Sequence, residues 1–424
     1  MATSASRSLI ADPTLASAGQ ARIEWAEAQM PLVRSIAQRF GRDRQLAELR
    51  VAACLHVTAE TANLALALQA GGAEVLLCAA NPLSTQDDTA AALVERHGIQ
   101  VRAVRGEGPD AYQASIQALV SQAPQVTLDD GADLIGALHA GSPDLLEGVL
   151  GATEETTSGL VRVRALESAG RLGCPVFAVN EARTERAFND RYGTGQSTLD
   201  GILRATHLLL AGQTVVVLGY GWTGQGVALR ARGAGASVIV CEVDPLRALE
   251  ARMEGFDVMP ALSAAERGDV FITVTGMRRV LTSEHFERMK DGAVLANAGH
   301  FDVEIDVPAL RQLAADEPRE VRPLVEQFEL PGRRLHLLAG GRVVNLAAGE
   351  GHPAAVMDMS FATQALCVQE LVRSKGGLEH RVLAIPDGID QEIARLKLAA
   401  LGVEIDELTA EQRSYLSAWD PEAE

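Results

Sequence analysis

The chain has 424 residues, and 56 acidic against 38 basic side chains give it a formal net charge of −18. At roughly 100–200 residues per domain, this length indicates two or three domains. Hydrophobic residues make up 47% of the chain and charged residues 22%, which excludes a disordered or collagen-like protein. The negative charge disfavours a nucleic-acid partner, and no apolar run reaches the roughly 18–20 residues of a membrane span. Because Met1–Pro13 also lacks the apolar core of a secretory signal, we expect a cytoplasmic protein with no nucleic-acid and no membrane partner.

Five cysteines are scattered along the chain, none of them in a CxxC pair or a Cys/His cluster with metal-ligand spacing. We therefore predict reduced structural cysteines and no metal site. The five are Cys54, Cys78, Cys174, Cys241 and Cys367.

The first 185 residues alternate helical patterns, such as Ala59–Gly71 and Gln86–His97, with short apolar runs. This alternation predicts an α/β fold with a parallel sheet and helices on both of its faces. The predicted strands are Leu49–Leu55, Ala73–Ala79, Ile99–Val104, Val126–Asp130 and Pro175–Val179.

A second α/β region begins near Leu199, and from about Asn345 the pattern becomes helical, with an amphipathic helix at Asp387–Gly402. The pattern predicts a nucleotide domain inserted into a discontinuous substrate domain. Its expected elements are strands at Thr214–Leu218, Ser237–Glu242, Val270–Thr275 and Ala293–Asn297, and a helix at Trp222–Arg232.

A glycine motif, Gly219-x-Gly221-x-x-Gly224, follows an apolar strand and opens a helix, which is the context that a dinucleotide fingerprint requires. Gly219 would allow the tight turn, Gly221 the approach of a pyrophosphate, and Gly224 close packing of helix on strand. The helix N-terminus would then offer free N–H groups to the phosphates.

Glu242 lies eighteen residues beyond Gly224, at the end of the next strand. A carboxylate there accepts hydrogen bonds from ribose hydroxyls and repels a 2′-phosphate, so the motif predicts NAD rather than NADP. The nearby Arg247 is the one feature that favours NADP.

Several ordered motifs accompany this fingerprint, and together they resemble the adenosylhomocysteinase (S-adenosylhomocysteine hydrolase) family in its shorter form, from about Val51 to Leu416. The resemblance implies a homotetramer. With the chain pattern, it indicates a Rossmann-type NAD-binding domain at residues 190–345 inserted in an α/β substrate-binding domain at 1–189 and 346–390, followed by a helical tail at 391–424. The motifs are Cys54–Thr61, Asn81–Asp87, Asp129–Asp133, Glu154–Gly159, Asn297–Asp306 and Gly351–Pro353.

The resemblance also implies a chemistry: the ribose 3′-OH of an adenine nucleoside is transiently oxidised by bound NAD, the C4′ proton is removed, and the 5′ substituent is eliminated. By the same resemblance, His56 and Asp130 are the acid/base pair at C4′ and C5′, Glu155 lies near the ribose hydroxyls, and His300 guards the 5′ end. The positions implied around the substrate are Leu55, Thr58, Glu60, Thr61, Thr194 and His352. Those implied around the cofactor, besides the fingerprint, are Thr156, Thr157, Ser158, Thr275, Gly276, Asn297 and Asn345.

Residue types alone leave other interpretations open. His56 could be a core histidine, Asp129–Asp130 could cap a turn, and Thr156–Ser158 could begin a helix as an N-cap.

One segment departs from the family pattern at the ribose. Glu185 stands where the family carries lysine, and Asn189-Asp190 stands where it carries Asp-Asn. A lysine there would stabilise the developing 3′-alkoxide, whereas a glutamate changes the local charge by two. Close to Glu155, Glu185 should have a raised pKa. We therefore count Glu185, Asn189 and Asp190 among the candidate catalytic residues.

Three hypotheses follow. The favoured one is a diverged paralogue that removes water from C5′ of an adenine nucleoside, a 4′,5′-dehydration suited to nucleoside antibiotic biosynthesis. The second is an ordinary S-adenosylhomocysteine hydrolase in which Arg183 or Arg186 replaces the lysine. The third is an NAD-binding regulatory relative without turnover, which the retained acid/base residues disfavour.

Overall fold

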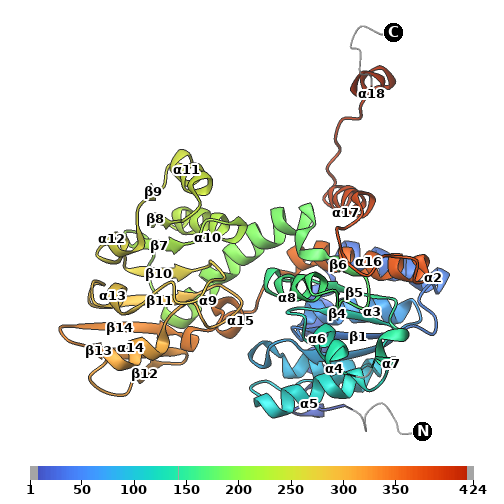
Figure 1. Cartoon of the computed structure of the whole chain (residues 1–424), viewed down its shortest axis with the longest axis horizontal. Coiled ribbons are helices and arrows are strands. Elements are labelled where there is room, and N and C mark those ends of the chain that lie inside the picture. The colour runs from blue at the N-terminus through green and yellow to red at the C-terminus, as the bar shows by residue number, and fades with distance from the viewer. Residues whose placement is uncertain (1–7, 142, 418–424) are drawn as a thin grey trace.

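The computed structural model describes residues 8–141 and 143–417. The expectations for residues 1–7, and for residues 418–424 of the predicted tail, therefore lie outside the described residues. Two lobes, each built around its own sheet, are connected by two passages of the chain (Figure 1).

The first lobe contains a parallel sheet in the order β15-β6-β5-β4-β1-β2-β3. Alternate residues of β1 pack on opposite faces of this sheet: Val51, Ala53 and Leu55 on one, Ala52 and Cys54 on the other. Strands buried on both faces are typical of a parallel sheet covered by helices. The strands are β1 (Arg50–Leu55), β2 (Glu74–Ala79), β3 (Gln100–Arg102), β4 (Val126–Asp129), β5 (Gly151–Glu154), β6 (Val176–Ala178) and β15 (Val382–Leu383).

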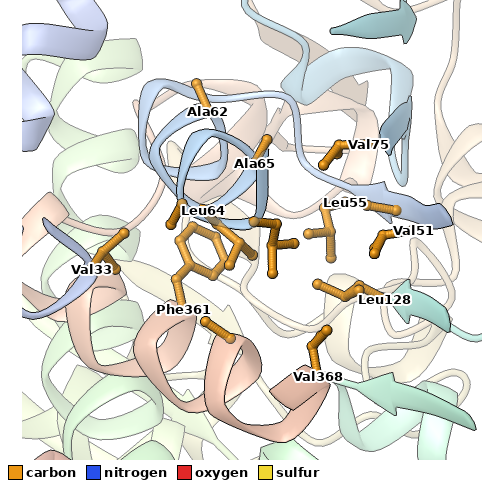
Figure 2. Close-up of a cluster of buried hydrophobic side chains, with 14 of the residues drawn as sticks. Val33, Val51, Leu55, Ala62, Leu64, Ala65, Val75, Leu128, Phe361 and Val368 are labelled. Atoms are coloured by element: carbon orange, nitrogen blue, oxygen red, sulfur yellow. The ribbon is translucent and has the colours of Figure 1, made fainter. Parts of the chain in front are cut away.

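The helices of this lobe form two layers. The larger core lies between the sheet and α3 and α16, where Leu64 and Phe361 pack against Leu55 and Leu128 (Figure 2). Helices α5 and α6 cover the other face. The bounds are α1 (Ala16–Glu27), α2 (Pro31–Asp43), α3 (Ala59–Ala70), α4 (Asp87–His97), α5 (Pro109–Val120), α6 (Asp133–Ala140), α7 (Asp144–Glu147), α8 (Thr157–Ser168), α16 (Ala354–Ser374), α17 (Asp387–Ala400) and α18 (Ala410–Ser417), with the short turns η2 (Pro13–Leu15), η3 (Pro82–Ser84) and η4 (Val179–Glu181).

The second lobe contains a sheet in the order β12-β13-β14-β11-β10-β7-β8-β9, in which β13 runs antiparallel to β12 and β14. Its strands are β7 (Thr214–Leu218), β8 (Ser237–Cys241), β9 (Asp257–Val258), β10 (Val270–Thr273), β11 (Ala293–Asn297), β12 (Arg319–Arg322), β13 (Val325–Leu330) and β14 (Arg333–Leu338). Its helices are α9 (Gly195–Thr206), α10 (Trp222–Gly233), α11 (Pro245–Met253), α12 (Ala261–Ala265), α13 (Ser283–Phe286), α14 (Val307–Leu313) and α15 (Val344–Ala347), with the turn η6 (Ala339–Gly341).

The predicted fold class, a parallel α/β architecture with a Rossmann-like domain, is confirmed. Strand β3 is shorter than predicted, and β5 and the hairpin β13–β14 were not predicted. Strand β5 has only four residues and includes Thr153 and Glu154, both buried, so it lacks the apolar run that marks its neighbours. We keep the predicted domain boundaries at 189/190 and 345/346 as a proposal.

The first passage between the lobes is the π-helix η5 (Glu185–Thr194), which continues directly into α9. π-Helical turns are rare and occur frequently at functional sites. Among the described helices, none is both long and apolar enough to cross a membrane.

Candidate active site

A cavity of about 610 Å³ lies between the lobes, and residues that follow β1, β4 and β5 of the first sheet and β10 and β11 of the second line it. The carboxyl ends of parallel strands are where open α/β sheets bind their ligands. All the predicted catalytic and substrate residues line this cavity: Leu55, His56, Thr58, Glu60, Thr61, Asp130, Glu155, Glu185, Asn189, Asp190, Thr194, His300 and His352.

His56 and Asp130 are paired, with Nε2 3.1 Å from Oδ2, a contact that is an ion pair when the histidine is protonated. They meet because β1 and β4 are neighbours, with Cys54 opposite Asp129, so the residues just beyond each strand emerge side by side. Burial lowers the pKa of His56, and the Asp130 carboxylate partly opposes this effect. The pair can therefore hold a proton and release it into the cavity.

Glu155 follows β5 and accepts hydrogen bonds from Ser360 and Gln364, which lie one turn apart on α16. Burial raises its pKa to about 8, and the nearby Asp130 carboxylate adds to the shift. At neutral pH this carboxyl is therefore mostly protonated.

Glu185 lies at the start of η5 and is only 3% exposed. Burial raises its pKa well above the ordinary value, and the carboxylates of Glu155 and Asp190 raise it further. Burial also raises the pKa of Asp190 to about 7. Three carboxyl groups thus gather where the resemblance implies a lysine.

The arginines proposed as substitutes for that lysine are not among the residues that line the cavity. The side chain of Arg186 is 40% exposed and pairs with Glu181 at 3.3 Å. Arg162 is the single lysine or arginine of the described cavity lining, and its Nη1 lies 2.8 Å from Oδ1 of Asp133. The structure therefore places neither predicted substitute in the cavity lining, although the charge of Arg186 partly opposes the raised pKa of Asp190.

The predicted adenine side is a polar pocket built on the start of α3 and the segment before α16. Thr58 caps α3 by accepting from the main-chain N–H of Thr61, and burial raises the pKa of Glu60. Across the pocket, Thr194 Oγ1 lies 3.0 Å from His352 Nε2. Burial lowers the pKa of His352 to about 4, so this histidine is neutral.

The glycine motif has the geometry that a dinucleotide needs. Gly219 has a φ of 107°, and a Cβ there would lie 2.9 Å from the carbonyl oxygen of Val274, which excludes other residues. A Cβ on Gly224 would lie 2.1 Å from the Gly219 carbonyl oxygen, so only glycine lets α10 approach β7 this closely. Glu242 accepts from the main-chain N–H of Tyr220 at 2.7 Å, which holds its carboxylate beside the turn.

Asn345 Oδ1, buried in the cavity wall, has no hydrogen-bond partner among the described residues. These residues fit NAD.

Similarity to known proteins identifies the family of this chain. Residues 7–145 match the family model described as S-adenosyl-L-homocysteine hydrolase, and residues 190–351 match the one described as its NAD-binding domain. An adenosylhomocysteinase of Aquifex aeolicus is 57% identical, over 97% of this chain and 98% of the relative. The chain belongs to the S-adenosyl-L-homocysteine hydrolase family. Another relative, an S-inosyl-L-homocysteine hydrolase of Methanopyrus kandleri, is 52% identical over 97% of both chains. NAD is accordingly the cofactor of this family member.

The predicted cofactor residues of this family member fall into three groups. Gly219 and Gly221 follow β7, Gly224 lies in α10 and Glu242 follows β8, and none of the four is in the cavity lining, whereas six others line the cavity. Asn297 is fully buried, and its amide donates to the main-chain oxygens of Gly299, Phe301 and Gly341. The structure thus does not bring Asn297 to the cavity wall. The six are Thr156, Thr157, Ser158, Thr275, Gly276 and Asn345.

Several residues that shape the site were not predicted. Glu304 accepts from the main-chain N–H groups of Thr275 and Gly276 and so shapes the loop after β10. It belongs to the Asn297–Asp306 motif, which was the available signal. Ser360 and Gln364 lie in a helix of 21 residues that is mostly core, so nothing in the pattern marked them.

Proposed function

We propose that this chain is an NAD-dependent nucleoside enzyme that oxidises the ribose 3′-OH transiently, deprotonates C4′ and eliminates the 5′ substituent. The favoured substrate is an adenine nucleoside that loses water from C5′. By resemblance to its family, we also propose a cytoplasmic homotetramer. The observation that carries the proposal is the burial of Glu185 beside Glu155 and Asp190, while His56 and Asp130 remain paired.

NAD, when bound, supplies reversible hydride transfer at the ribose 3′ carbon. His56 and Asp130 would remove the C4′ proton and deliver one to the leaving oxygen at C5′. A proton on the leaving group matters most for hydroxide, which leaves poorly from carbon without one. The lowered pKa of His56 favours proton release into the cavity.

At the ribose, Glu185 in place of lysine removes the cation that would stabilise a 3′-alkoxide. With raised pKa values, Glu155 and Glu185 would face the sugar as neutral acids that donate hydrogen bonds. This arrangement supports a differently substituted sugar or leaving group from that of a family member with lysine.

The second candidate is hydrolysis of S-adenosylhomocysteine to adenosine and homocysteine. It is supported by the names of relatives at 52–57% identity over nearly the whole chain. Arg183 and Arg186 are absent from the described cavity lining, which counts against a hydrolase in which one of these arginines replaces the lysine.

One experiment separates the two. The NAD-loaded enzyme is incubated with adenosine, other adenine nucleosides and S-adenosylhomocysteine, and the products are followed by mass spectrometry. The proposal predicts a nucleoside product lighter by one water and little release of homocysteine. Efficient homocysteine release with no dehydrated product would support the hydrolase instead.

A further inference from the structure

Ser84, the last residue of η3, lies behind His56 and has no role in the mechanism above. It is 4% exposed and lines another cavity, of about 440 Å³, which shares Thr58, Leu346 and Glu350 with the lining of the candidate active site; Ser84 itself is not part of that lining. Its Oγ lies 2.7 Å from Nδ1 of His56 and 2.7 Å from the main-chain oxygen of Asn81. The hydroxyl therefore connects the histidine to a carbonyl oxygen.

These two distances determine where the hydrogens lie. A serine hydroxyl has a single hydrogen and can donate once. A hydroxyl oxygen and a carbonyl oxygen 2.7 Å apart require that hydrogen between them, so Ser84 donates to Asn81. The hydroxyl must then accept from Nδ1–H of His56.

The consequence appears on the other side of the imidazole ring. With the hydrogen on Nδ1, a neutral histidine presents Nε2 as an acceptor. Nε2 lies 3.1 Å from a carboxylate oxygen of Asp130, which is also an acceptor. Two acceptors at this distance need one proton between them, so the pair carries a single exchangeable proton on its cavity side.

We propose that Ser84 is a positioning residue that locks His56 in the Nδ1–H tautomer, so that the proton shared with Asp130 stays on the side of the substrate. The inference rests on the proposed function only where the shared proton is transferred to or from the substrate. The tautomer of His56 is a property of the enzyme without substrate. Because Asn81 ends the chain of hydrogen bonds at a carbonyl, Ser84 holds the ring and does not pass protons to solvent.

The titratable groups around His56 agree with a single shared proton. Asp130 faces it from the loop after β4, His300 from the loop after β11, and His352 from the segment before α16. Burial and His300 lower the pKa of His56, whereas Asp130 raises it. Burial keeps His352 neutral. The position of the proton shared by His56 and Asp130 thus depends on Asp130 and on the tautomer of His56 that Ser84 selects.

The test is ¹⁵N NMR of the NAD-bound, ¹⁵N-histidine-labelled enzyme, with the signals of His56 assigned from their loss in His56→Asn. We expect a protonated Nδ1 in the wild type and a mixture of tautomers in Ser84→Ala. Ser84→Thr should retain the wild-type pattern. Thr85→Val is the matched control, because the neighbouring buried Thr85 hydroxyl has no hydrogen-bond partner among the described residues.

A kinetic readout accompanies the spectra, with whichever nucleoside the enzyme turns over. Ser84→Ala should lose about tenfold in kcat with KM little changed, and its pH profile should shift, because only part of the enzyme then holds the correct tautomer. Ser84→Thr should restore most of kcat. A protonated Nε2 and bare Nδ1 in the wild type, or an unchanged tautomer in Ser84→Ala, would overturn the proposal. If Ser84→Ala does not fold, the wild-type and Ser84→Thr spectra still decide it. Failure of turnover with every nucleoside would contradict the proposed function and leave the NMR result valid.

Discussion

The two groups of ionisable residues in the cavity differ in charge balance. His56 and Asp130 form a paired acid and base, 3.1 Å apart, on neighbouring strand ends. Glu155, Glu185 and Asp190 instead gather as three acids, all with raised pKa values. By the resemblance, His56, Asp130 and Glu155 keep the pattern of the family, whereas Glu185 and Asp190 depart from it.

The predicted departures from the family pattern, at Glu185 and Asn189-Asp190, are therefore confined to one segment of the chain. The pair that we propose to handle protons at C4′ and C5′ lies just beyond β1 and β4, with Ser84 of η3 behind His56, whereas Glu185 and Asp190 lie in η5, a π-helical connection between the lobes. We therefore propose that substitutions in η5 change the sugar that is accepted and leave the proposed elimination chemistry in place.

The largest effect should come from breaking the paired group. His56→Asn removes the group that exchanges a proton with the substrate, and turnover should fall by about 10²- to 10⁴-fold with the fold intact. His97→Asn, a histidine outside the cavity lining, is the matched control. Single-turnover kinetics with circular dichroism would measure both, and near-wild-type turnover in His56→Asn would show that the pair is not catalytic.

A smaller effect, on the free energy of unfolding, is expected from a substitution of Glu185 in the group of three acids. Because the folded-state pKa of Glu185 is raised, the native state keeps a proton that the unfolded chain releases above pH ~4.5. Its contribution to the free energy of unfolding is therefore complete below pH ~4.5 and is lost as the pH rises towards the folded-state pKa. Glu185→Gln should be more stable than the wild type at pH 8 by about 1–3 kcal/mol, and by less at pH 5.

Urea unfolding at the two pH values measures this difference. Glu287→Gln, on the exposed surface, should show no such pH dependence relative to the wild type. An equal effect of Glu185→Gln at both pH values would contradict a raised pKa in the folded state.

Much of the fold was predictable, since the strands of both parallel regions are apolar runs that end at turn residues. Strand β5 was missed because Thr153 and Glu154 are polar yet buried, and only the neighbouring strands show why they are tolerated. The residues that line the cavity were predictable as a set, because their motifs occur in the order of the family, but the side chains that hydrogen-bond to them were not. Ser84 and Ser360 reach His56 and Glu155 across 28 and 205 residues of chain, and such contacts leave no local pattern.

The central claim is that Glu185 turned a shared elimination scaffold towards another substrate. The most direct measurement is homocysteine release from S-adenosylhomocysteine by NAD-loaded wild type and Glu185→Lys, alongside formation of dehydrated nucleoside. The lysine in Glu185→Lys would place a cation beside the ribose, which should stabilise a 3′-alkoxide by up to several kcal/mol. We predict that Glu185→Lys raises homocysteine release at least tenfold and lowers dehydration. Wild-type release that is already efficient, and falls in Glu185→Lys, would contradict the account.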